Sequence, residues 1–438
     1  MISRSITHHH FSRVSIHSTQ PTNGVLLKTK EVFPCESLDL RHAILHQRSM
    51  TKTKLQKPAI LSISLLIILM NAAIVPLLSQ IRSAFPGASS LQVQMVLSLP
   101  ALTSILFSLL TGLAARWIPK KWLLAIGLLG YSFFGIAAGG AGSIEELLLL
   151  RALFGAGTGI ISPLASDLIA DFYAGKERNA MIGYSNSTAN IAGIIFPLLA
   201  SQLAAIHWRL AFFIYTIGLL VLVFAMLFIP KPIRLASEDQ EKKNIRMQWS
   251  ATRQAIIMLL FMMLFYALPT NLSVFVQTEG IGSPSTAALA VSTSTFIATL
   301  FSLWFSRLYQ RFRDWLLPTS LALLGLSFLI IGIMPNLSAL LTAQLAAGIA
   351  MGLIFPYLTT KVIEHSQPET TTAGLALLSS MLGLGMFISP FFFAFINSIL
   401  PVVFIRTQFW LTAEILGVGA LILSVWLLGR KAAVPVNQ

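Results

Sequence analysis

Charged residues are scarce in this 438-residue chain. Asp, Glu, Lys and Arg make up 11% of it, against about 25% in soluble domains, whereas hydrophobic residues make up 55%. Too few charged side chains are present to cover the surface of a water-soluble protein. The composition therefore excludes a soluble globular protein and predicts one that lies largely within a membrane.

Cysteine and the motifs of several enzyme classes are missing as well. Cys35 is the only cysteine, so the chain forms neither an internal disulfide nor a cysteine zinc cluster. No Gly-x-x-x-x-Gly-Lys-Ser/Thr loop occurs, which argues against ATP as an energy source. His207 and His365 are expected on opposite sides of the membrane, so no cluster of His, Asp, Glu or Cys suggests catalysis. We expect no enzyme activity, no metal site and no cofactor.

What the chain does have is a series of long apolar runs. Each is near the roughly 20 residues that cross a bilayer as a helix. Each must be helical, because unpaired backbone groups are costly in lipid and the runs lack the alternation of a barrel strand. We predict an all-α integral membrane fold of twelve transmembrane helices. The spans are expected at residues 58–78, 92–115, 121–142, 145–170, 179–204, 208–229, 254–277, 286–306, 315–335, 338–363, 370–398 and 405–428.

The formal net charge of +14 is unevenly distributed between the two ends of these spans. Twenty Lys and Arg residues after Met50 fall on the side shared by both termini, whereas the opposite loops hold only Arg82, Arg209 and Arg406. Loops with excess Lys and Arg stay in the cytoplasm. We therefore expect a multi-pass plasma membrane protein with both termini in the cytoplasm, and no nucleic acid as a partner.

Residues 1–49 differ from the rest of the chain. They hold six of the eight histidines and no acidic residue before Glu31. One interpretation is a transit segment; the other is upstream sequence joined to a chain whose start is Met50, which leads through a short basic stretch into the first span. The second is favoured. His8, His9 and His10 are interpreted as a disordered tract rather than a metal site.

A polar stretch and an internal repeat divide the chain into two halves. GAGTGIISP, from Gly155 to Pro163, recurs 193 positions later as GIAMGLIFP, from Gly348 to Pro356. Small residues at a spacing of four let neighbouring helices approach closely in lipid. Parallel repeats of this kind predict two pseudo-symmetric six-helix bundles with a site at their interface. We expect an N-terminal extension at 1–57, bundles at 58–229 and 254–428, a central cytoplasmic loop at 230–253 and a tail at 429–438.

Two motifs stand out after Met50, RALFGAGTGIISP (151–163) and HWRLAFFIY (207–215). The first resembles the fourth-span motif of the major facilitator superfamily and the second the opening of its sixth span, and the resemblance covers nearly all of the chain after Met50. GLAARWIPKK (112–121) resembles the basic turn between spans two and three but lacks the family's Asp. The fifth span also departs from the motif of proton-coupled drug antiporters. The general likeness is to the twelve-span drug and small-molecule efflux branch.

The resemblance implies residues that control the change between two alternating states. The turn after span two would lock the cytoplasmic ends, and Asp167 or Asp171 is expected to replace its missing acid as a partner for Arg116 or Arg178. The glycines and prolines of the repeat would allow helices to approach and bend. The residues expected to control conformation are Gly112, Arg116, Gly155, Gly159, Pro163, Asp167, Asp171, Arg178, Arg307, Gly348, Gly352 and Pro356.

Polar residues inside spans one, four, five and seven are candidates for the substrate pathway. They are Asn71, Arg151, Thr158, Ser162, Asn186, Asn190, Tyr266, Asn271 and Gln277. Arg151 cannot lose its charge, so it must face a cavity, snorkel or pair; each Asn alternatively clasps a neighbouring helix. Glu414, the one carboxylate well inside a span of the second half, either carries a proton or has a lipid-facing or paired role. Such a sparse, mostly neutral lining suits hydrophobic or amphipathic molecules better than sugars or phosphates.

The sequence therefore favours a monomeric secondary active transporter. We expect it to export hydrophobic or amphipathic small molecules across the lipid bilayer by alternating access, with protons as the coupling ion. An importer or facilitator on the same fold is the main alternative. A transport-inactive membrane sensor is less favoured, because the 24-residue central loop leaves no room for a large cytoplasmic domain.

Overall fold

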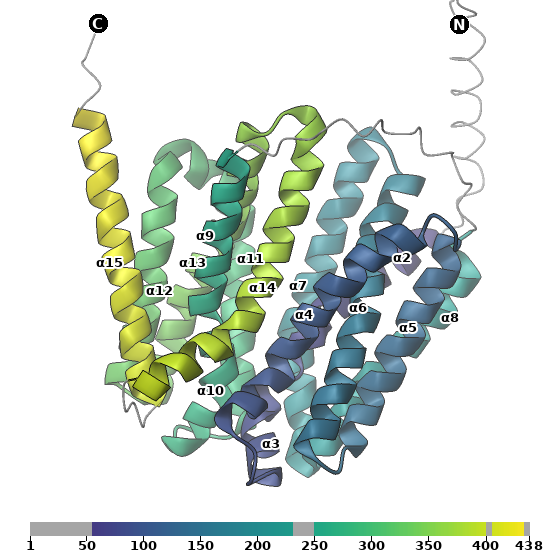
Figure 1. Ribbon diagram of the computed structural model, residues 1–438, viewed down its shortest axis with the longest axis horizontal. Coiled ribbons are helices and arrows are strands. Elements are labelled where there is room, and N and C mark those ends of the chain that lie inside the picture. Colours follow the sequence, from purple (N-terminus) through teal and green to yellow (C-terminus); the bar gives the residue numbers. More distant parts are fainter. Residues whose placement is uncertain (1–54, 231–248, 400–404, 433–438) are drawn as a thin grey trace, which may run out of the picture. The chain divides into compact units, whose positions relative to one another are not determined.

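The computed structural model describes residues 55–230, 249–399 and 405–432, which all belong to one compact unit, Thr53–Gln438. These residues are almost entirely helical and contain no β-strand, which confirms the all-α prediction (Figure 1). Residues 1–54 of the predicted extension (1–57), most of the central loop and residues 433–438 of the predicted tail lie outside the described residues. The predicted bundle boundaries therefore stay predictions.

Twelve spans account for the described helices. The first six are α2 Gln56–Ala72 with η1 Val75–Leu77 and α3 Leu78–Ala84, α4 Ser90–Ala114, α5 Lys120–Ala137 with η2 Ala138–Gly140, α6 Ile144–Phe172, α7 Gly175–Ile206, and η3 Trp208–Thr216 with α8 Ile217–Phe228. The last six are α9 Trp249–Phe265 with α10 Ala267–Thr278, α11 Pro284–Phe312, η4 Arg313–Trp315 with α12 Leu316–Ile333, α13 Leu337–His365, α14 Pro368–Ile399 and α15 Ile405–Ala432.

Length and hydropathy support the membrane assignment. Eleven continuous segments among the described residues are long and apolar enough to cross a bilayer. One of them, Pro284–Ile333, has 50 residues and comprises both α11 and α12. The chain reverses between these two helices at Arg313, which has a positive φ of 45°. The segments therefore correspond to twelve spans, as predicted.

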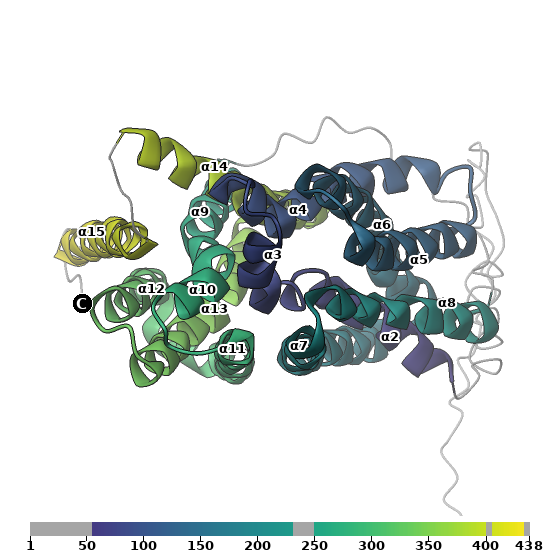
Figure 2. The same ribbon diagram turned by 90° about the horizontal axis from the view of Figure 1, so that it is seen from below.

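The helices pack as two bundles. In the first, α4 and α5 lie against α6, and α2 lies against α7; in the second, α11 and α12 lie against α13, and α9 lies against α14 (Figure 2). The bundles contact each other through α4 with α14 and α7 with α11. The segments α3 and α10, which follow the breaks in spans one and seven, also meet, at the lower end in Figure 1.

The repeated glycines lie where helices of one bundle cross. A Cβ atom on Gly155 would be 2.5 Å from the backbone oxygen of Pro100 in α4, and one on Gly348 would be 2.5 Å from that of Ser294 in α11. Both helices continue through Pro163 and Pro356. Since packing replaces the hydrophobic drive between helices in lipid, these glycines permit the contacts that hold each bundle together.

Spans one and seven are both interrupted, and at equivalent positions. The first breaks after Ala72 and continues through η1, where Pro76 lacks an N–H; the second breaks at Tyr266, just before Pro269. Ala73 and Tyr266 are separated by the 193-residue offset of the repeat. Both bundles therefore carry a bend in their first helix.

We predict that Gly155→Ala lowers stability by about 1–3 kcal/mol, because the new methyl group overpacks the contact with α4. Gly183→Ala in α7 is the matched control, since a Cβ there meets nothing within 4 Å. The measurement is the thermal unfolding midpoint of each purified variant in one detergent. Equal midpoints for the two variants would show that the close approach of α4 and α6 does not depend on glycine.

Candidate functional site

Arg151 is the largest fully buried side chain of the described residues, with an exposed fraction of 0%. Its Nε donates to the backbone oxygen of Val96 at 2.9 Å and its Nη2 to that of Met70 at 3.1 Å. Its Nη1 donates to the hydroxyl of Tyr215 at 3.3 Å. The guanidinium also lies over the ring of Phe154, 4.6 Å from the centroid. No carboxylate among the described residues forms an ion pair with Arg151, so carbonyl dipoles and aromatic faces balance its charge.

Both carbonyl groups bound by Arg151 are ones that helix defects release. The oxygen of Val96 would accept from residue 100, which is Pro100 and has no N–H. The oxygen of Met70 would accept from the N–H of Ile74, but that group bonds to Asn71 instead because span one is interrupted. Arg151 therefore stabilises two irregular helices from a third. Its predicted contact with cargo stays a prediction.

The other candidates of spans one, four and five differ in burial. Asn71 is half-buried and its Oδ1 has no hydrogen-bond partner, whereas the Thr158 hydroxyl is buried and donates to Phe154 of its own helix at 3.1 Å. Ser162 and Asn190 are half-buried, and Asn186 is exposed. Of these five, Asn71 is the one with an unsatisfied buried acceptor.

In span seven, Asn271 joins the two bundles. Gln94 of α4 donates from Nε2 to Asn271 Oδ1 at 2.8 Å, and Asn271 Nδ2 donates to the Ala267 oxygen at 2.8 Å. Asn271 Nδ2 also lies 3.4 Å from Gln408 Oε1 in α15. Asn271 is thus a clasp between helices, the alternative open for each intramembrane Asn. Gln277, near the end of α10, is exposed.

Two serines form a second contact between the bundles. The hydroxyls of Ser79 in α3 and Ser273 in α10 are 2.8 Å apart, and Ser273 also donates to the oxygen of Pro76 at 2.8 Å. Ser292 of α11 donates to the Ile194 oxygen of α7 at 2.7 Å. The sequence analysis did not predict a role for these serines. Pro76 and Pro269, which mark the breaks in spans one and seven, were the sequence feature that could have directed attention to the segments that carry Ser79 and Ser273. All described hydrogen bonds between the bundles lie toward the end where α3 and α10 meet.

The opposite end, which we call the basic side, carries Lys57, Lys120 and Lys361. Lys120 Nζ lies 2.9 Å from Asp171 and 3.4 Å from Asp167, so the partner of both acids is Lys120 and not Arg116 or Arg178 as predicted. Lys120 begins α5 and α6 packs beside it, which brings the acids within reach. The family-like turn thus supplies a lysine for this pair rather than Arg116.

The second bundle has a similar cluster in which the charges of the paired helices are exchanged. In the first bundle the acids lie near the end of α6, whereas in the second the lysine, Lys361, lies near the end of α13. Lys361 Nζ is 2.9 Å from Asp314 and 3.2 Å from Glu364. Every described ion pair of the basic side joins residues of one bundle. The predicted conformational residues Gly112, Arg116, Arg178 and Arg307 are exposed there. In the described residues the bundles are thus tied by polar contacts at one end only.

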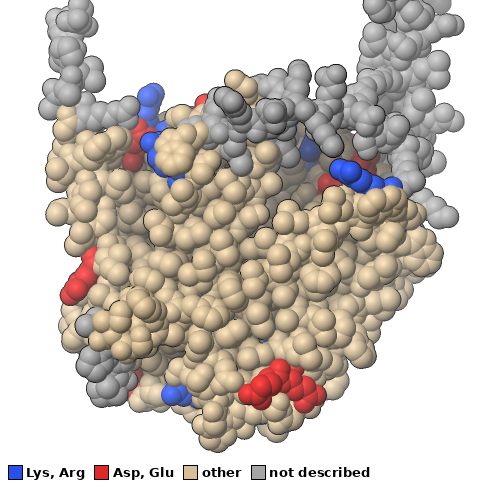
Figure 3. All heavy atoms as spheres, in the orientation of Figure 1, with Lys and Arg blue, Asp and Glu red and all other residues tan. Residues whose placement is uncertain are grey.

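The surface between the two ends is mostly uncharged. Figure 3 shows a broad uncharged band, with most of the visible Lys, Arg, Asp and Glu near its upper and lower margins. Large apolar side chains such as Leu109, Phe133 and Leu421 are more than half exposed in this structure. A band of this kind is compatible with lipid rather than water.

We predict that Arg151→Gln destabilises the protein and that Pro100→Ala reduces this loss. Alanine at position 100 restores an N–H for the Val96 oxygen, so one of the two carbonyl groups no longer needs Arg151. The expected difference between the two backgrounds is about 1 kcal/mol, the net value of one hydrogen bond. Thermal unfolding of the four proteins of this cycle measures it. If Arg151→Gln lowers the free energy of unfolding equally in both backgrounds, Arg151 does not compensate for the N–H that Pro100 lacks.

The sequence was compared with protein families and with known proteins. The sequence profile of the Major Facilitator Superfamily matches residues 60–282 and, again, 256–438. The quinolone resistance protein NorA of Staphylococcus aureus (strain MRSA252) is 22% identical over 298 residues, which are 66% of this chain and 76% of NorA. Multidrug resistance protein 1 of Bacillus subtilis (strain 168) is 22% identical over 344 residues, 74% of this chain and 85% of that protein.

Solved structures share the fold at low sequence identity. A bacterial homolog of the human lysosomal transporter Spinster, in an inward-facing and occupied conformation, superposes with a TM-score of 0.65 at 17% identity, covering 88% of this chain and 94% of that one. A D-xylose-proton symporter superposes with a TM-score of 0.67 at 17% identity, covering 84% and 96%. With its profile matched in both halves, the chain belongs to the Major Facilitator Superfamily and is a transporter.

Proposed function

We propose that this protein is a secondary active exporter of hydrophobic or amphipathic small molecules that works by alternating access. The observation that carries the proposal is that the described polar contacts between the bundles lie at one end, together with the interrupted spans one and seven. Two bundles that pack through apolar helix faces and share only a few neutral hydrogen bonds at one end are able to rock about a site between them. The names of the two curated relatives, which describe resistance to drugs, support export of such compounds.

The proposed orientation follows from charge. Loops rich in Lys and Arg stay in the cytoplasm, so we assign the basic side to the cytoplasm and the α3–α10 end to the outside. With this orientation, the hydrogen bonds of Ser79, Ser273 and Asn271 hold the outer side closed. A substrate-pathway residue on the basic side of this closure, such as Asn71, would then be reached from the cytoplasm, as an exporter requires, whereas Gln277 at the end of α10 lies beyond the closure.

Proton influx is the driving force that we propose, in line with the general likeness to the efflux branch rather than with the fifth-span antiporter motif, which this chain lacks. Among the acidic residues that the structure describes, Glu414 alone lies more than two turns from an end of its span. It is exposed on α15, which packs mainly on α12 at the edge of the second bundle. We therefore assign the proton to no carboxylate, and the coupling needs a direct test. Import on the same scaffold is the main alternative.

We predict that the wild-type protein in inside-out vesicles moves a hydrophobic aromatic compound and that the same compound discharges an imposed proton gradient. Transport is followed as uptake of the labelled compound, and proton movement by a pH-sensitive dye. Uptake without gradient discharge would support uncoupled transport. Loss of compound from preloaded vesicles would support import, and absence of any movement across a broad panel would favour the sensor.

A locked variant is the matched control for this assay. Ser79→Cys with Ser273→Cys places two thiols where the hydroxyls lie 2.8 Å apart, in a background in which the single native cysteine is changed by Cys35→Ser. We predict that oxidation abolishes transport and that reduction restores it, because the disulfide prevents the outer ends from separating. Transport that is unchanged after complete oxidation would show that α3 and α10 need not part.

A further inference from the structure

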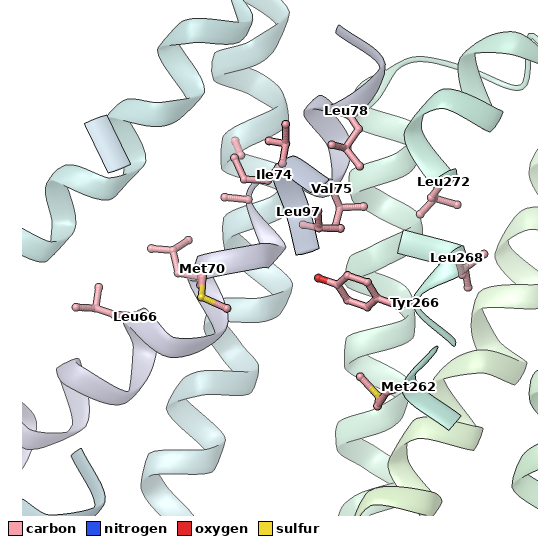
Figure 4. Packing of buried hydrophobic residues seen from close by; sticks show 14 of the residues in the cluster. Leu66, Met70, Ile74, Val75, Leu78, Leu97, Met262, Tyr266, Leu268 and Leu272 are labelled. Atoms are coloured by element: carbon pink, nitrogen blue, oxygen red, sulfur yellow. The ribbon is translucent and has the colours of Figure 1, made fainter. Parts of the chain in front are cut away.

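Tyr266 stands at the break of span seven, on the face that meets the first bundle. Its side chain is only 4% exposed, and its hydroxyl has no hydrogen-bond partner. Figure 4 shows the hydroxyl directed away from its own bundle, toward the part of span one that carries Met70 and Val75. The polar group therefore lies between the bundles rather than inside one of them.

The neighbouring polar groups of α10 are satisfied, which sets Tyr266 apart. Thr270 donates to the backbone oxygen of Tyr266 at 2.7 Å, and Asn271 and Ser273 bond across the bundle interface. A buried hydroxyl without a protein partner is costly, so the Tyr266 hydroxyl is available to bond a molecule that enters between the bundles. Tyr131 also has a buried hydroxyl without a partner, but its ring packs on Phe154 and Tyr215 within the first bundle.

The charges around this position disfavour a cation. Arg151 donates to the oxygen of Met70, in the segment that the Tyr266 hydroxyl faces, and it has no described ion-pair partner. Among the described residues, the acidic side chains lie near the ends of the spans, apart from Glu414 on α15. A buried cation without a nearby counter-charge pays a large desolvation penalty. Cargo at the height of Tyr266 would therefore meet the charge of Arg151 and no described carboxylate.

The apolar neighbours fit an aromatic cargo of adaptable shape. Met70 of span one, Met262 of span seven and Leu97 of α4 belong with Tyr266 to one cluster of buried hydrophobic residues; in Figure 4 the Tyr266 hydroxyl points toward the side of Met70, and Met262 lies below the ring. Methionine is flexible and polarizable and forms favourable contacts with aromatic rings. The surroundings thus supply apolar contacts and one free hydrogen-bond donor.

We infer that Tyr266 is a specificity-determining residue whose hydroxyl donates a hydrogen bond to an acceptor on neutral aromatic cargo, and that the site discriminates against permanent cations. This inference rests on the proposed transport function and narrows its substrate class. Cargo that supplies the acceptor would satisfy the buried hydroxyl, whereas a cation of the same shape would not. A neutral compound without an acceptor would gain the apolar contacts alone.

Three probes with the same three phenyl rings test this inference. Triphenylphosphine oxide is neutral with a strong acceptor, methyltriphenylphosphonium is a cation, and triphenylmethane is neutral without an acceptor. Binding to the purified full-length protein in lipid nanodiscs is measured by calorimetry against empty nanodiscs. We expect the oxide to bind at least about tenfold more tightly than the phosphonium, and Tyr266→Phe to weaken oxide binding about five- to tenfold while leaving triphenylmethane unchanged.

Tyr131→Phe is the matched control, because it removes an equally buried and unpartnered hydroxyl away from the bundle interface. It should leave the binding of all three probes unchanged. Phosphonium binding as tight as that of the oxide, no effect of Tyr266→Phe on the oxide, or no binding of any probe would each overturn the inference. Uptake of the probes into vesicles distinguishes this inference from the proposed transport function. If the phosphonium is exported, the transport function stands and this specificity is wrong. If the probes bind as expected but no compound moves, the site stands and the transport function is wrong.

Discussion

The structure depends on the requirement that every backbone carbonyl within the membrane find a partner inside the protein. In a continuous helix the chain meets this requirement by itself, but an interrupted span leaves carbonyl groups without their usual donors. Arg151 supplies donors for two such groups, one released by Pro100 and one by the break in span one. A charged side chain can stay inside a membrane-spanning bundle because the irregular backbone around it needs a strong donor.

The two halves solve the same problem in different ways. In the first half the donors come from other spans, Arg151 of α6 and Tyr215 of η3, which both bond to the Met70 oxygen. In the second half the position equivalent to Arg151 is Gln344, and the side chains of Thr270 and Asn271 donate to the backbone oxygens of Tyr266 and Ala267 in their own span. The second break is therefore flanked by local side-chain bonds, and the segment beyond it, α10, bonds to the other bundle through Asn271 and Ser273.

The amino-acid sequence predicted what depends on composition and spacing along one helix. Apolar runs located the twelve spans, and the glycines of the repeat lie at the crossings that their spacing suggested. It did not predict contacts whose partners are chosen by the packing of distant helices. Lys120, Arg116 and Arg178 are all possible ion-pair partners of Asp171. The packing of α5 against α6 selects Lys120, and this packing cannot be read from the sequence. The serine pair of α3 and α10 is 194 residues apart and carries no local pattern.

The strength of the polar contacts near the α3–α10 end also bears on whether the bundles can separate. The hydrogen bonds between them join neutral groups, such as Ser79 with Ser273 and Gln94 with Asn271, and each contributes about 0.5–1.5 kcal/mol net. A few such bonds together stabilise the contact between the bundles by a few kcal/mol. The binding free energy of a small molecule is large enough to offset this amount. Salt bridges at the same places would be harder to open without water. The described ion pairs instead lie within one bundle, where they hold a helix end in place and need not break when the bundles move.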